Sequence, residues 1–280
     1  MKIALLTGHH PRHFYVANEI SKISKDFLVV SSTMGLNPAE AGDHGAPDIS
    51  IIKWFNDRLV SERSYFKDLG FNLENGYVLP VASNEINSEA VYKTVLGFKP
   101  DIVVVYGTSI LKGPLINITS KTINFHLGLS PYYNGAGTNW WPMYNNEYEY
   151  VGTTIHYLDS GVDTGEIIGQ CRSIINTSDS PHDIGNKNII AGCRLLIEIL
   201  PFLFAGKITP IKQWKVTGRP IYKMKEFSKI KLTEFQEAIK NGSIKNWVNL
   251  NNWGDYDMVD FNNGSPKLSK SNLLKPMRVK

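Results

Sequence analysis

Hydrophobic positions fall into two kinds of block along the first two-thirds of the chain. Residues 2–7, 27–31 and 101–105 are short runs rich in Val, Ile and Leu, too short for helices and typical of buried strands. Residues 49–69 instead repeat apolar side chains at helical spacing, after a stretch at 34–48 whose prolines and glycines predict a loop. This pattern predicts an α/β fold: a Rossmann-like, mostly parallel twisted sheet with helices on both faces.

The same alternation continues further along the chain. A helix is predicted at residues 87–98, and strands are predicted at 122–126, 149–159 and 166–174. A long helix then begins where Ser180 can cap it and a proline suits its first position. These elements extend the predicted sheet and its helical cover.

The residues after 206 follow a different pattern. They contain one predicted strand, residues 208–214, and one predicted helix, residues 232–242. Thr233 and Gln236 give that helix a capping-box signature. The residues after Asn262 are polar and are predicted to be disordered.

Charge changes at the same point. Residues 1–206 hold 15 Lys and Arg against 20 Asp and Glu, a balance of −5, whereas residues 207–280 hold 15 against 6, a balance of +9. This break predicts one domain over 1–206 and a basic C-terminal extension over 207–280. A basic extension suits an anionic partner, such as a phosphate-bearing substrate or a nucleic acid, although a solvated lysine-rich tail has the same composition. It can also pack across a homodimer.

Composition excludes several classes of protein. Apolar residues make up 42% and charged residues 20% of the chain, which is typical of a globular protein and not of a disordered one. With only Cys171 and Cys193, the chain has no disulfide scaffold, and a reducing compartment is expected. The apolar run Ile3–Leu6 is too short for a signal peptide, and the apolar stretch 189–206 is interrupted by Arg, Glu and Pro. We therefore expect a cytoplasmic protein without a membrane span.

Candidate chemistry gathers between residues 122 and 168. Asn124 and His126 end an apolar strand, and because strand side chains alternate, both point to the same face. At a strand end an amide and an imidazole can both reach one developing oxyanion. The loop 127–139 can cover a ligand, and the turn 159–165 displays carboxylates that can hold or charge a histidine. From spacing alone, a structural Asn-x-His pair, an ordinary loop and a cation site remain alternatives.

The order of these pieces resembles the folate-dependent formyltransferase superfamily, which includes glycinamide ribonucleotide and methionyl-tRNA formyltransferases. That family has a strand ending in N-x-H, a loop S-L-L-P-x-x-x-G and a later turn L-D-x-G. Here the corresponding pieces are INFH, LGLSPYYNGAG and LDSGVDTG. The resemblance covers residues 98–206, and it implies a catalytic trio at Asn124, His126 and Asp163.

The resemblance also implies a mechanism, direct transfer of the formyl group of 10-formyltetrahydrofolate to a neutral amine. Asn124 and His126 would hold the oxyanion, and Asp163 would orient His126, raise its pKa and help to relay the amine proton through water. His156 is expected to be a supporting or core residue. By position, the residues that would bind the folate donor are Ser109, Ile110, Leu111, Asp159, Ser160, Gly161 and Val162. Ile110 and Leu111 fit a plain core equally well.

The acceptor site is predicted from two loops, the one at residues 8–13 after the first strand and the one at 131–139. The first lacks the glycine pattern with which glycinamide ribonucleotide formyltransferase binds phosphate, which counts against a purine-pathway substrate. Expected acceptor contacts are His9, His10, Arg12, Tyr132, Asn134, Gly135 and Thr138. No metal is expected, because no cysteine or carboxylate completes a ligand set around the histidines of residues 9–13.

Within the family, the loop LGLSPYYNGAGTNWW is closest in character to sugar N-formyltransferases. The expected acceptor is therefore a small, phosphate-bearing amine, a nucleotide-linked amino sugar of polysaccharide biosynthesis. A methionyl-tRNA-type enzyme would carry a C-terminal β-barrel larger than the basic extension, so a nucleic acid is not the expected partner. A formyltetrahydrofolate hydrolase and an inactive folate or nucleotide-sugar binding module remain alternatives.

Overall fold

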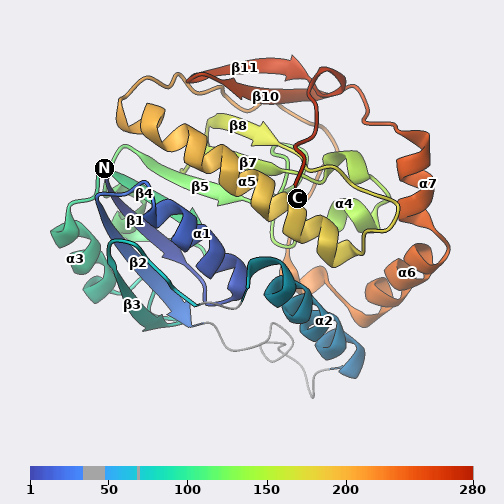
Figure 1. The fold of residues 1–280 in the computed structure, drawn as a ribbon, viewed down its shortest axis with the longest axis horizontal. Coiled ribbons are helices and arrows are strands. Elements are labelled where there is room, and N and C mark those ends of the chain that lie inside the picture. Colours follow the sequence, from blue (N-terminus) through green and yellow to red (C-terminus); the bar gives the residue numbers. More distant parts are fainter. Residues whose placement is uncertain (34–47, 68–69, 280) are drawn as a thin grey trace.

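A computed structural model describes residues 1–33, 48–67 and 70–279, and Figure 1 shows their arrangement. Of the loop predicted over residues 34–48, only Asp48 belongs to the described part, and Leu69 of the predicted helix lies outside it. No helix in the described part of the chain has both the length and the apolar character needed to cross a membrane.

A mixed sheet forms the centre of the molecule. In the described residues it has seven strands, in the order β3-β2-β1-β4-β5-β7-β8. The strands from β3 to β5 run parallel, whereas β7 is antiparallel to β5 and β8 is antiparallel to β7. Their bounds are β1 (Lys2–Thr7), β2 (Asp26–Thr33), β3 (Tyr77–Ala82), β4 (Ile102–Tyr106), β5 (Thr122–His126), β7 (Thr153–Tyr157) and β8 (Ile167–Cys171). The predicted mostly parallel α/β sheet is confirmed.

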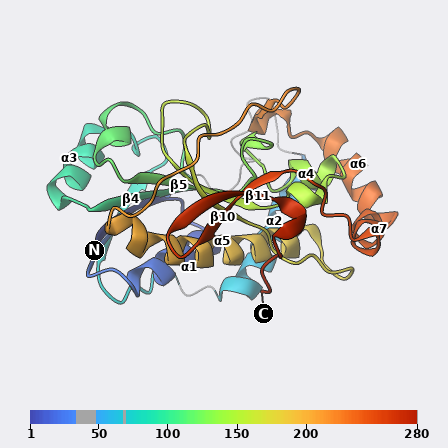
Figure 2. The same cartoon turned by 90° about the horizontal axis from the view of Figure 1, so that it is seen from above.

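Helices cover both faces of this sheet, as Figure 2 shows edge-on. The alternation of side chains along β1 explains why, because Ile3 and Leu5 pack in one core with α1 and α5, whereas Ala4 and Leu6 pack in another with α3. The helices of residues 1–206 are α1 (Pro11–Ser21), α2 (Ile49–Phe66), α3 (Glu89–Phe98), α4 (Trp141–Tyr144) and α5 (Pro181–Phe204). Short 3-10 turns occur at η1 (Gly113–Asn117), η2 (Tyr148–Tyr150), η3 (Met224–Glu226) and η4 (Ser271–Leu273).

Strand β3 has no counterpart in the prediction. Its apolar run contains Pro80, which argues against a strand in the middle of a sheet. In the structure β3 pairs with β2 at the edge of the sheet, and its side chains are exposed or half-buried. An edge strand tolerates a proline because it has a side without ladder partners.

The first half of the extension differs from its prediction. The expected strand at 208–214 is reduced to a single antiparallel bridge between Ile211 and Ile167, because Pro210 cannot donate to a ladder. The predicted helix exists as α6 (Lys229–Lys240), but it begins three residues before 232. Its cap is Ser228, whose side chain accepts from the backbone of Lys231, so the predicted cap Thr233 lies inside the helix.

The second half of the extension is also structured. Helix α7 (Ser243–Leu250) follows α6, and the strands β10 (Asp257–Asn262) and β11 (Ser265–Lys270) form a hairpin. The predicted disorder after Asn262 is therefore wrong. Asn263 and Gly264 both have left-handed φ angles, 47° and 85°, as a two-residue hairpin turn requires, and this Asn-Gly pair is a signal that the sequence offered.

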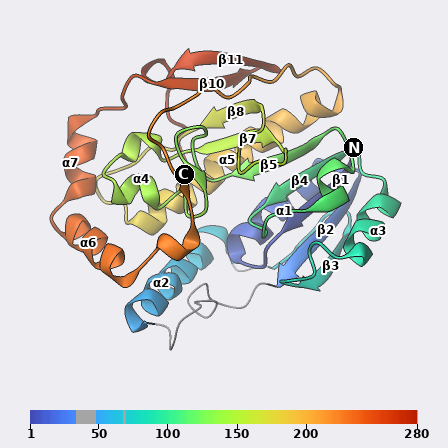
Figure 3. The same cartoon turned by 180° about the vertical axis from the view of Figure 1, so that it is seen from behind.

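The extension packs against the rest of the chain. One buried cluster combines Leu129 and Tyr133 with Phe235, Trp247 and Met258 of the extension. Figure 3 shows α6 and α7 on the side of the molecule where α4 lies. The division at residue 206 and a homodimer stay predictions, but the two parts of the chain share a core.

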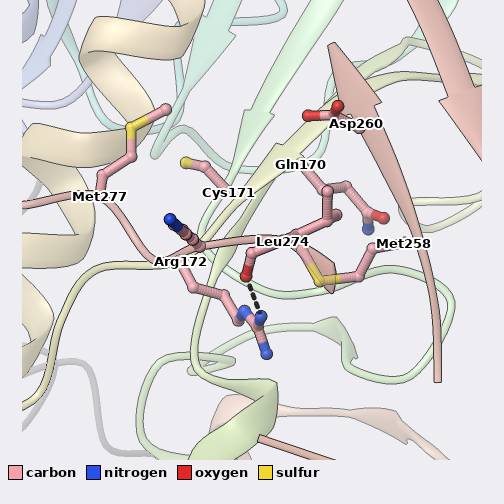
Figure 4. A pocket seen from close by; sticks show the side chains of 8 residues that line it. Gln170, Cys171, Arg172, Met258, Asp260, Leu274 and Met277 are labelled. Carbon is pink, nitrogen blue, oxygen red and sulfur yellow. Dashed lines mark hydrogen bonds between the residues drawn. The ribbon is translucent and has the colours of Figure 1, made fainter. Parts of the chain in front are cut away.

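The buried Arg172, directly after β8, holds the C-terminal end in place. Its guanidinium donates to the carbonyls of Ser271 at 2.7 Å and Leu274 at 3.0 Å and to the hydroxyl of Tyr256 at 3.0 Å. It also lies 4.6 Å from the centre of the Trp253 ring. Figure 4 shows Arg172 beside a small pocket between β8 and the extension.

Candidate active site

The structure brings Asn124, His126 and Asp163 into one hydrogen-bonded group. Asn124 and His126 lie on the same side of β5, because Ile123 and Phe125 enter the core with α5 on the other side. Asn124 Nδ2 donates to Asp163 Oδ1 at 3.0 Å, and His126 Nδ1 lies 3.4 Å from Asp163 Oδ2. One carboxylate therefore contacts both side chains that the strand presents.

Asp163 reaches the strand because its turn folds back over the sheet. The turn follows β7, which pairs with β5 so that His156 lies opposite Asn124. The φ angle of Asp163 is 54°, a left-handed conformation that Asp and Asn adopt more readily than most residues. The backbone N–H of Gly135 also donates to Asp163 Oδ2, at 2.8 Å. The site thus extends from the carboxyl end of β5 onto the face of that strand.

Burial and charge shift the pKa of His126 in opposite directions. Burial lowers it, and the Asp163 carboxylate raises it as predicted, but burial outweighs the carboxylate and the pKa lies below its ordinary value. His126 Nε2 lies 2.9 Å from the carbonyl oxygen of Tyr133. Because both ring nitrogens face oxygen acceptors, a neutral ring can donate to only one of them, and protonation completes both hydrogen bonds.

The carboxylate itself is stabilised in its ionised form. Burial alone would raise the pKa of Asp163, but His126 and the backbone N–H of Gly135 oppose it and hold the pKa well below its usual range. Asp163 is therefore ionised at neutral pH, with both oxygens engaged by donors.

His156 supports the group, as expected. It is 1% exposed, and its Nδ1 donates to the carbonyl of Tyr157 at 2.7 Å. With the proton on Nδ1, Nε2 is the acceptor that faces Asn124 Nδ2 at 3.2 Å. His156 therefore fixes the orientation of the Asn124 amide, whose N–H groups face His156 and Asp163.

The residues predicted to bind the donor lie on two segments. On the segment after β4, Ser109 and Ile110 are exposed, Ile110 by 70%, whereas Leu111 is buried in the core beneath α3. Leu158, which precedes the second segment, packs against that same core. Leu111 therefore belongs to the core, whereas Ile110 is exposed and is not part of the core.

The second segment is the turn 159–162. The Asp159 carboxylate accepts from the backbone N–H of Gly161 at 3.1 Å and from the hydroxyl of Thr164 at 2.9 Å. Ser160 and Gly161 are exposed, and Val162 is half-buried.

The predicted acceptor contacts after β1 are already engaged in part. His9 Nδ1 lies 3.0 Å from the hydroxyl of Ser31. Arg12 donates twice to Glu62, at 2.7 and 3.0 Å, and Glu62 is 1% exposed. Burial, and then the charge of Arg12, lower the pKa of His10 to about 4. Arg12 is thus a structural ion-pair partner, whereas His9 remains exposed.

The four predicted contacts from the second loop point in different directions. Tyr132 is 7% exposed and its hydroxyl bonds to the backbone of Asp257, so this side chain packs in the core shared with the extension. Thr138 is buried and donates to the carbonyl of Leu127 at 2.7 Å. Gly135 supports Asp163, and Asn134 Oδ1 is buried without a hydrogen-bond partner among the described residues.

Sequence reasoning missed three residues that shape the site. Tyr133 contributes through its carbonyl, and Gln213 contacts the Asp163 turn from the extension. Gly128 is needed for space, because a Cβ there would lie 2.5 Å from His126 Nε2. Backbone carbonyls and contacts between distant segments leave no local pattern, and Gly128 alone offered a signal, a glycine two residues after the histidine.

The histidines of residues 9–13 do not converge. His9 faces Ser31, while His13 Nδ1 accepts from the backbone N–H of His10 at 3.1 Å. Within the described ranges, no group of three or more His, Cys, Asp or Glu residues is placed to hold a metal ion.

Comparison with known proteins shows the family of this chain. A family model described as formyl transferase matches residues 23–200, and the chain belongs to that family. It is 34% identical to the methionyl-tRNA formyltransferase of Geobacillus sp. (strain WCH70) over 160 residues, and this matched region covers 56% of this chain and 50% of that protein. The chain spans about half the length of the curated relatives it matches. The resemblance expected from the motifs is confirmed.

Solved structures show the same fold at low sequence identity. A 4-N formyltransferase from Francisella tularensis is similar with a TM-score of 0.54 and 16% identity, over 84% of this chain and 85% of that chain. The N-formyltransferase from Helicobacter canadensis, in complex with folinic acid and dTDP-3-aminofucose, is similar with a TM-score of 0.51 and 17% identity, over 84% and 79% of the two chains.

Proposed function

We propose that the protein is a folate-dependent N-formyltransferase, which moves the formyl group of 10-formyltetrahydrofolate to the amine of a small anionic acceptor. The observation that carries the proposal is the group formed by Asn124, His126 and Asp163. An amide donor, an imidazole and an ionised carboxylate within contact distance suit acyl transfer, which needs stabilised oxygen charge and a path for the amine proton.

Each side chain has a separate task in this proposal. Asn124 contributes one of the N–H groups that it otherwise directs at Asp163 and His156, and the protonated ring of His126 contributes its positive charge. Together they stabilise the negative charge that develops on the formyl oxygen. The attacking amine loses a proton, and Asp163 helps to relay it through water. A proton on His126 is held by two acceptors, Asp163 and the Tyr133 carbonyl, so the site tolerates positive charge when the oxygen charge appears.

The donor supplies an activated formyl group. The residues proposed to hold it are Ser109 and Ile110 on one segment and the turn of residues 159–162 on the other. Leu111 belongs to one core, and Leu158 packs against the same core, which supports the proposal that both segments line one donor site.

The acceptor that we propose is a nucleotide-linked amino sugar. The unpartnered Asn134 Oδ1 beside the Asp163 contact of Gly135 offers an acceptor to a sugar hydroxyl or amine. The +9 charge of residues 207–280 supplies cations for a diphosphate, and His9 and His10 remain proposed contacts after β1.

A methionyl-tRNA acceptor is the second candidate. It is favoured by the 34% identity to a methionyl-tRNA formyltransferase over about half of each chain. Residues 207–279, however, form α6, α7 and the β10–β11 hairpin, and several of their apolar side chains pack in the shared core. This arrangement supports a small acceptor over a large one.

A direct comparison of acceptors tests the proposal. Purified protein is given 10-formyltetrahydrofolate with nucleotide-linked 3-amino or 4-amino sugars, or with charged initiator tRNA, and tetrahydrofolate release is followed spectroscopically. We expect turnover with an amino sugar, lost in His126→Ala. The acceptor KM should rise only moderately between about 50 and 200 mM salt, because few phosphates are contacted. Formylation of the tRNA with no activity on any amino sugar would refute the acceptor class, and no turnover with any amine would refute the enzyme.

A further inference from the structure

Residues 207–222 of the extension, which we call the crossing segment, run across the candidate site. At one end Ile211 and Ile167 exchange two backbone hydrogen bonds, at 2.7 and 2.8 Å. At the other end the short strand β9 (Ile221–Tyr222) pairs with β6 (Asn134–Gly135) in the loop over His126. The segment is therefore anchored on both sides of the site by main-chain contacts.

Gln213 lies between these anchors. Its side-chain Nε2 donates to the carbonyl oxygens of Asp163 and Gly165, both at 2.8 Å. The two carbonyls belong to the turn in which Asp163 adopts its left-handed conformation. A residue other than glycine is strained in that region, and its surroundings must offset the strain. The side-chain amide of Gln213 thus holds the backbone of this turn, without touching the Asp163 carboxylate.

The crossing segment also supports the Tyr133 carbonyl, the second hydrogen-bond acceptor that faces His126. The hydroxyl of Tyr133 donates to Glu147. Arg219 of the crossing segment pairs with Glu147, and its guanidinium lies 5.1 Å from the centre of the Tyr133 ring. Residues of the extension therefore contact both residues, Asp163 and Tyr133, whose oxygen atoms flank the imidazole.

We infer that Gln213 is a positioning residue of the active site, which sets the placement of the Asp163 carboxylate by holding the two carbonyls of its turn. The inference rests on the proposed function. Gln213 contacts backbone oxygens and not the side chains of the trio, so its effect reaches the chemistry through Asp163. A carboxylate displaced by a fraction of an ångström keeps its charge but loses its alignment with His126, and such misplacement lowers the rate more than the affinity.

The first test compares three variants with the parent protein. Gln213→Met keeps the volume without an N–H group, and Gln213→Glu keeps the shape but turns an ionised carboxylate toward two carbonyl oxygens. Thr217→Ala is the matched control, because Thr217 is an exposed, uncharged residue of the same segment. We expect kcat to fall by on the order of ten- to a hundredfold in Gln213→Met and further in Gln213→Glu, with acceptor KM within about twofold. Thr217→Ala should behave as the parent.

The second test needs no substrate. Groups that face the His126 ring are Asp163 from the turn, His156 from β7 and the Tyr133 carbonyl from the loop. When Asp163 is less well held, its upward influence on the pKa of His126 weakens, so that pKa measured by NMR should fall in Gln213→Met relative to Thr217→Ala. The His126 signal is assigned by its absence in His126→Gln.

The outcomes separate the two proposals. Parent-like kcat and parent-like His126 pKa in Gln213→Met would overturn the positioning role while leaving the proposed function intact. If the parent formylates no amine, the proposed function fails, and the NMR titration still decides the role of Gln213. Should Gln213→Met not fold, Gln213→Asn keeps an amide that is too short to reach both carbonyls and serves in both tests.

Discussion

Asp163 meets donors from three directions: the Asn124 amide, the Gly135 backbone and a ring nitrogen of His126. Its left-handed backbone is one that asparagine also adopts readily. Asp163→Asn therefore changes the charge while keeping the volume and the backbone. This makes it a cleaner probe of the site than a truncation.

We expect Asp163→Asn, His126→Ala and Asn124→Ala each to lower kcat by on the order of a hundredfold or more. The reason is that each removes a group that stabilises developing charge or aligns one that does. Steady-state tetrahydrofolate release measures the effect, with circular dichroism to show that the fold is retained.

Asn72→Ala is the control for these variants, because Asn72 is exposed and donates its backbone N–H, which the substitution keeps, to the side chain of Asn18. Its kcat should equal that of the parent. A His126→Ala protein with near-normal turnover would contradict the mechanism even if the other two variants were inactive.

At the scale of single residues, the sequence predicts side chains on one strand better than side chains in a loop. The alternation of a strand is enough to place Asn124 and His126 on one face. Tyr132 and Tyr133 are adjacent in a loop, and nothing local tells which one supports the site. Their roles depend on Asp257 of the hairpin and Glu147, which the fold brings to them across the chain.

Helix α5 is the longest described element, and its N-terminus is built around Ser180. The Ser180 hydroxyl accepts from the backbone N–H of Asp183, and the Asp183 carboxylate accepts from the backbone N–H of Ser180. The helix then packs along the core that contains β5, the strand of Asn124 and His126. The cap therefore contributes to the support of the site.

Ser180→Ala should lower the free energy of unfolding by about 1 kcal/mol, because the first-turn N–H groups lose their acceptor. Thr233→Ala should leave it nearly unchanged, since Thr233 is exposed inside α6. Urea denaturation measures both. Equal destabilisation by the two substitutions would contradict the assignment of Ser228 as the cap of α6.

The two capping signatures show what local pattern can predict for an element. At Ser180 the following proline excludes an earlier helical start, and the predicted boundary is confirmed. At Thr233 the residues before it, from Lys229 to Leu232, continue a helix equally well, so the true start lies at the preceding serine. A cap is thus predictable when the sequence also says where the helix cannot continue.

Several buried or half-buried histidines in the described part of the molecule have a lowered pKa in the folded state. Burial, and then nearby arginines, lower the pKa of His10 and of His182 to about 4, and burial lowers the pKa of His13 and of His126. Their unfolded pKa is the ordinary one, near 6.5. The unfolded chain therefore binds more protons below that pH, and the stability that these groups contribute is present above it.

We expect the free energy of unfolding to fall as pH drops from about 6.5 toward 4, by up to about 1.4 kcal/mol per pH unit for each histidine. Urea denaturation at several pH values measures the slope. The His182 ring packs against Trp54, with 4.2 Å between the two ring centres. His182→Gln removes this titrating group and should make the dependence of stability on pH shallower. A stability that stays constant between pH 7 and pH 5 would contradict this account.

Arg172 ties the C-terminal end to the sheet in a way that a lysine cannot reproduce. Arg172→Lys keeps the charge but lacks the planar fork that reaches Ser271, Leu274 and Tyr256 together. Buried acceptors left unpaired cost about 1–3 kcal/mol each. Hydrogen exchange over residues 253–274 should therefore be faster in Arg172→Lys and unchanged in the control Lys275→Ala, whose side chain is exposed.

The pairing of β6 with β9 has a consequence for anyone who wishes to redesign the acceptor. Gly135 has a φ of 105°, and a Cβ there would lie 2.1 Å from the carbonyl oxygen of Tyr222. The loop over His126 and a stretch of the extension are thus shaped to each other. We therefore expect that a loop 131–139 taken from a relative will fit this chain only if residues 219–222 are exchanged with it. A library of variants made for new acceptors should vary the two stretches together.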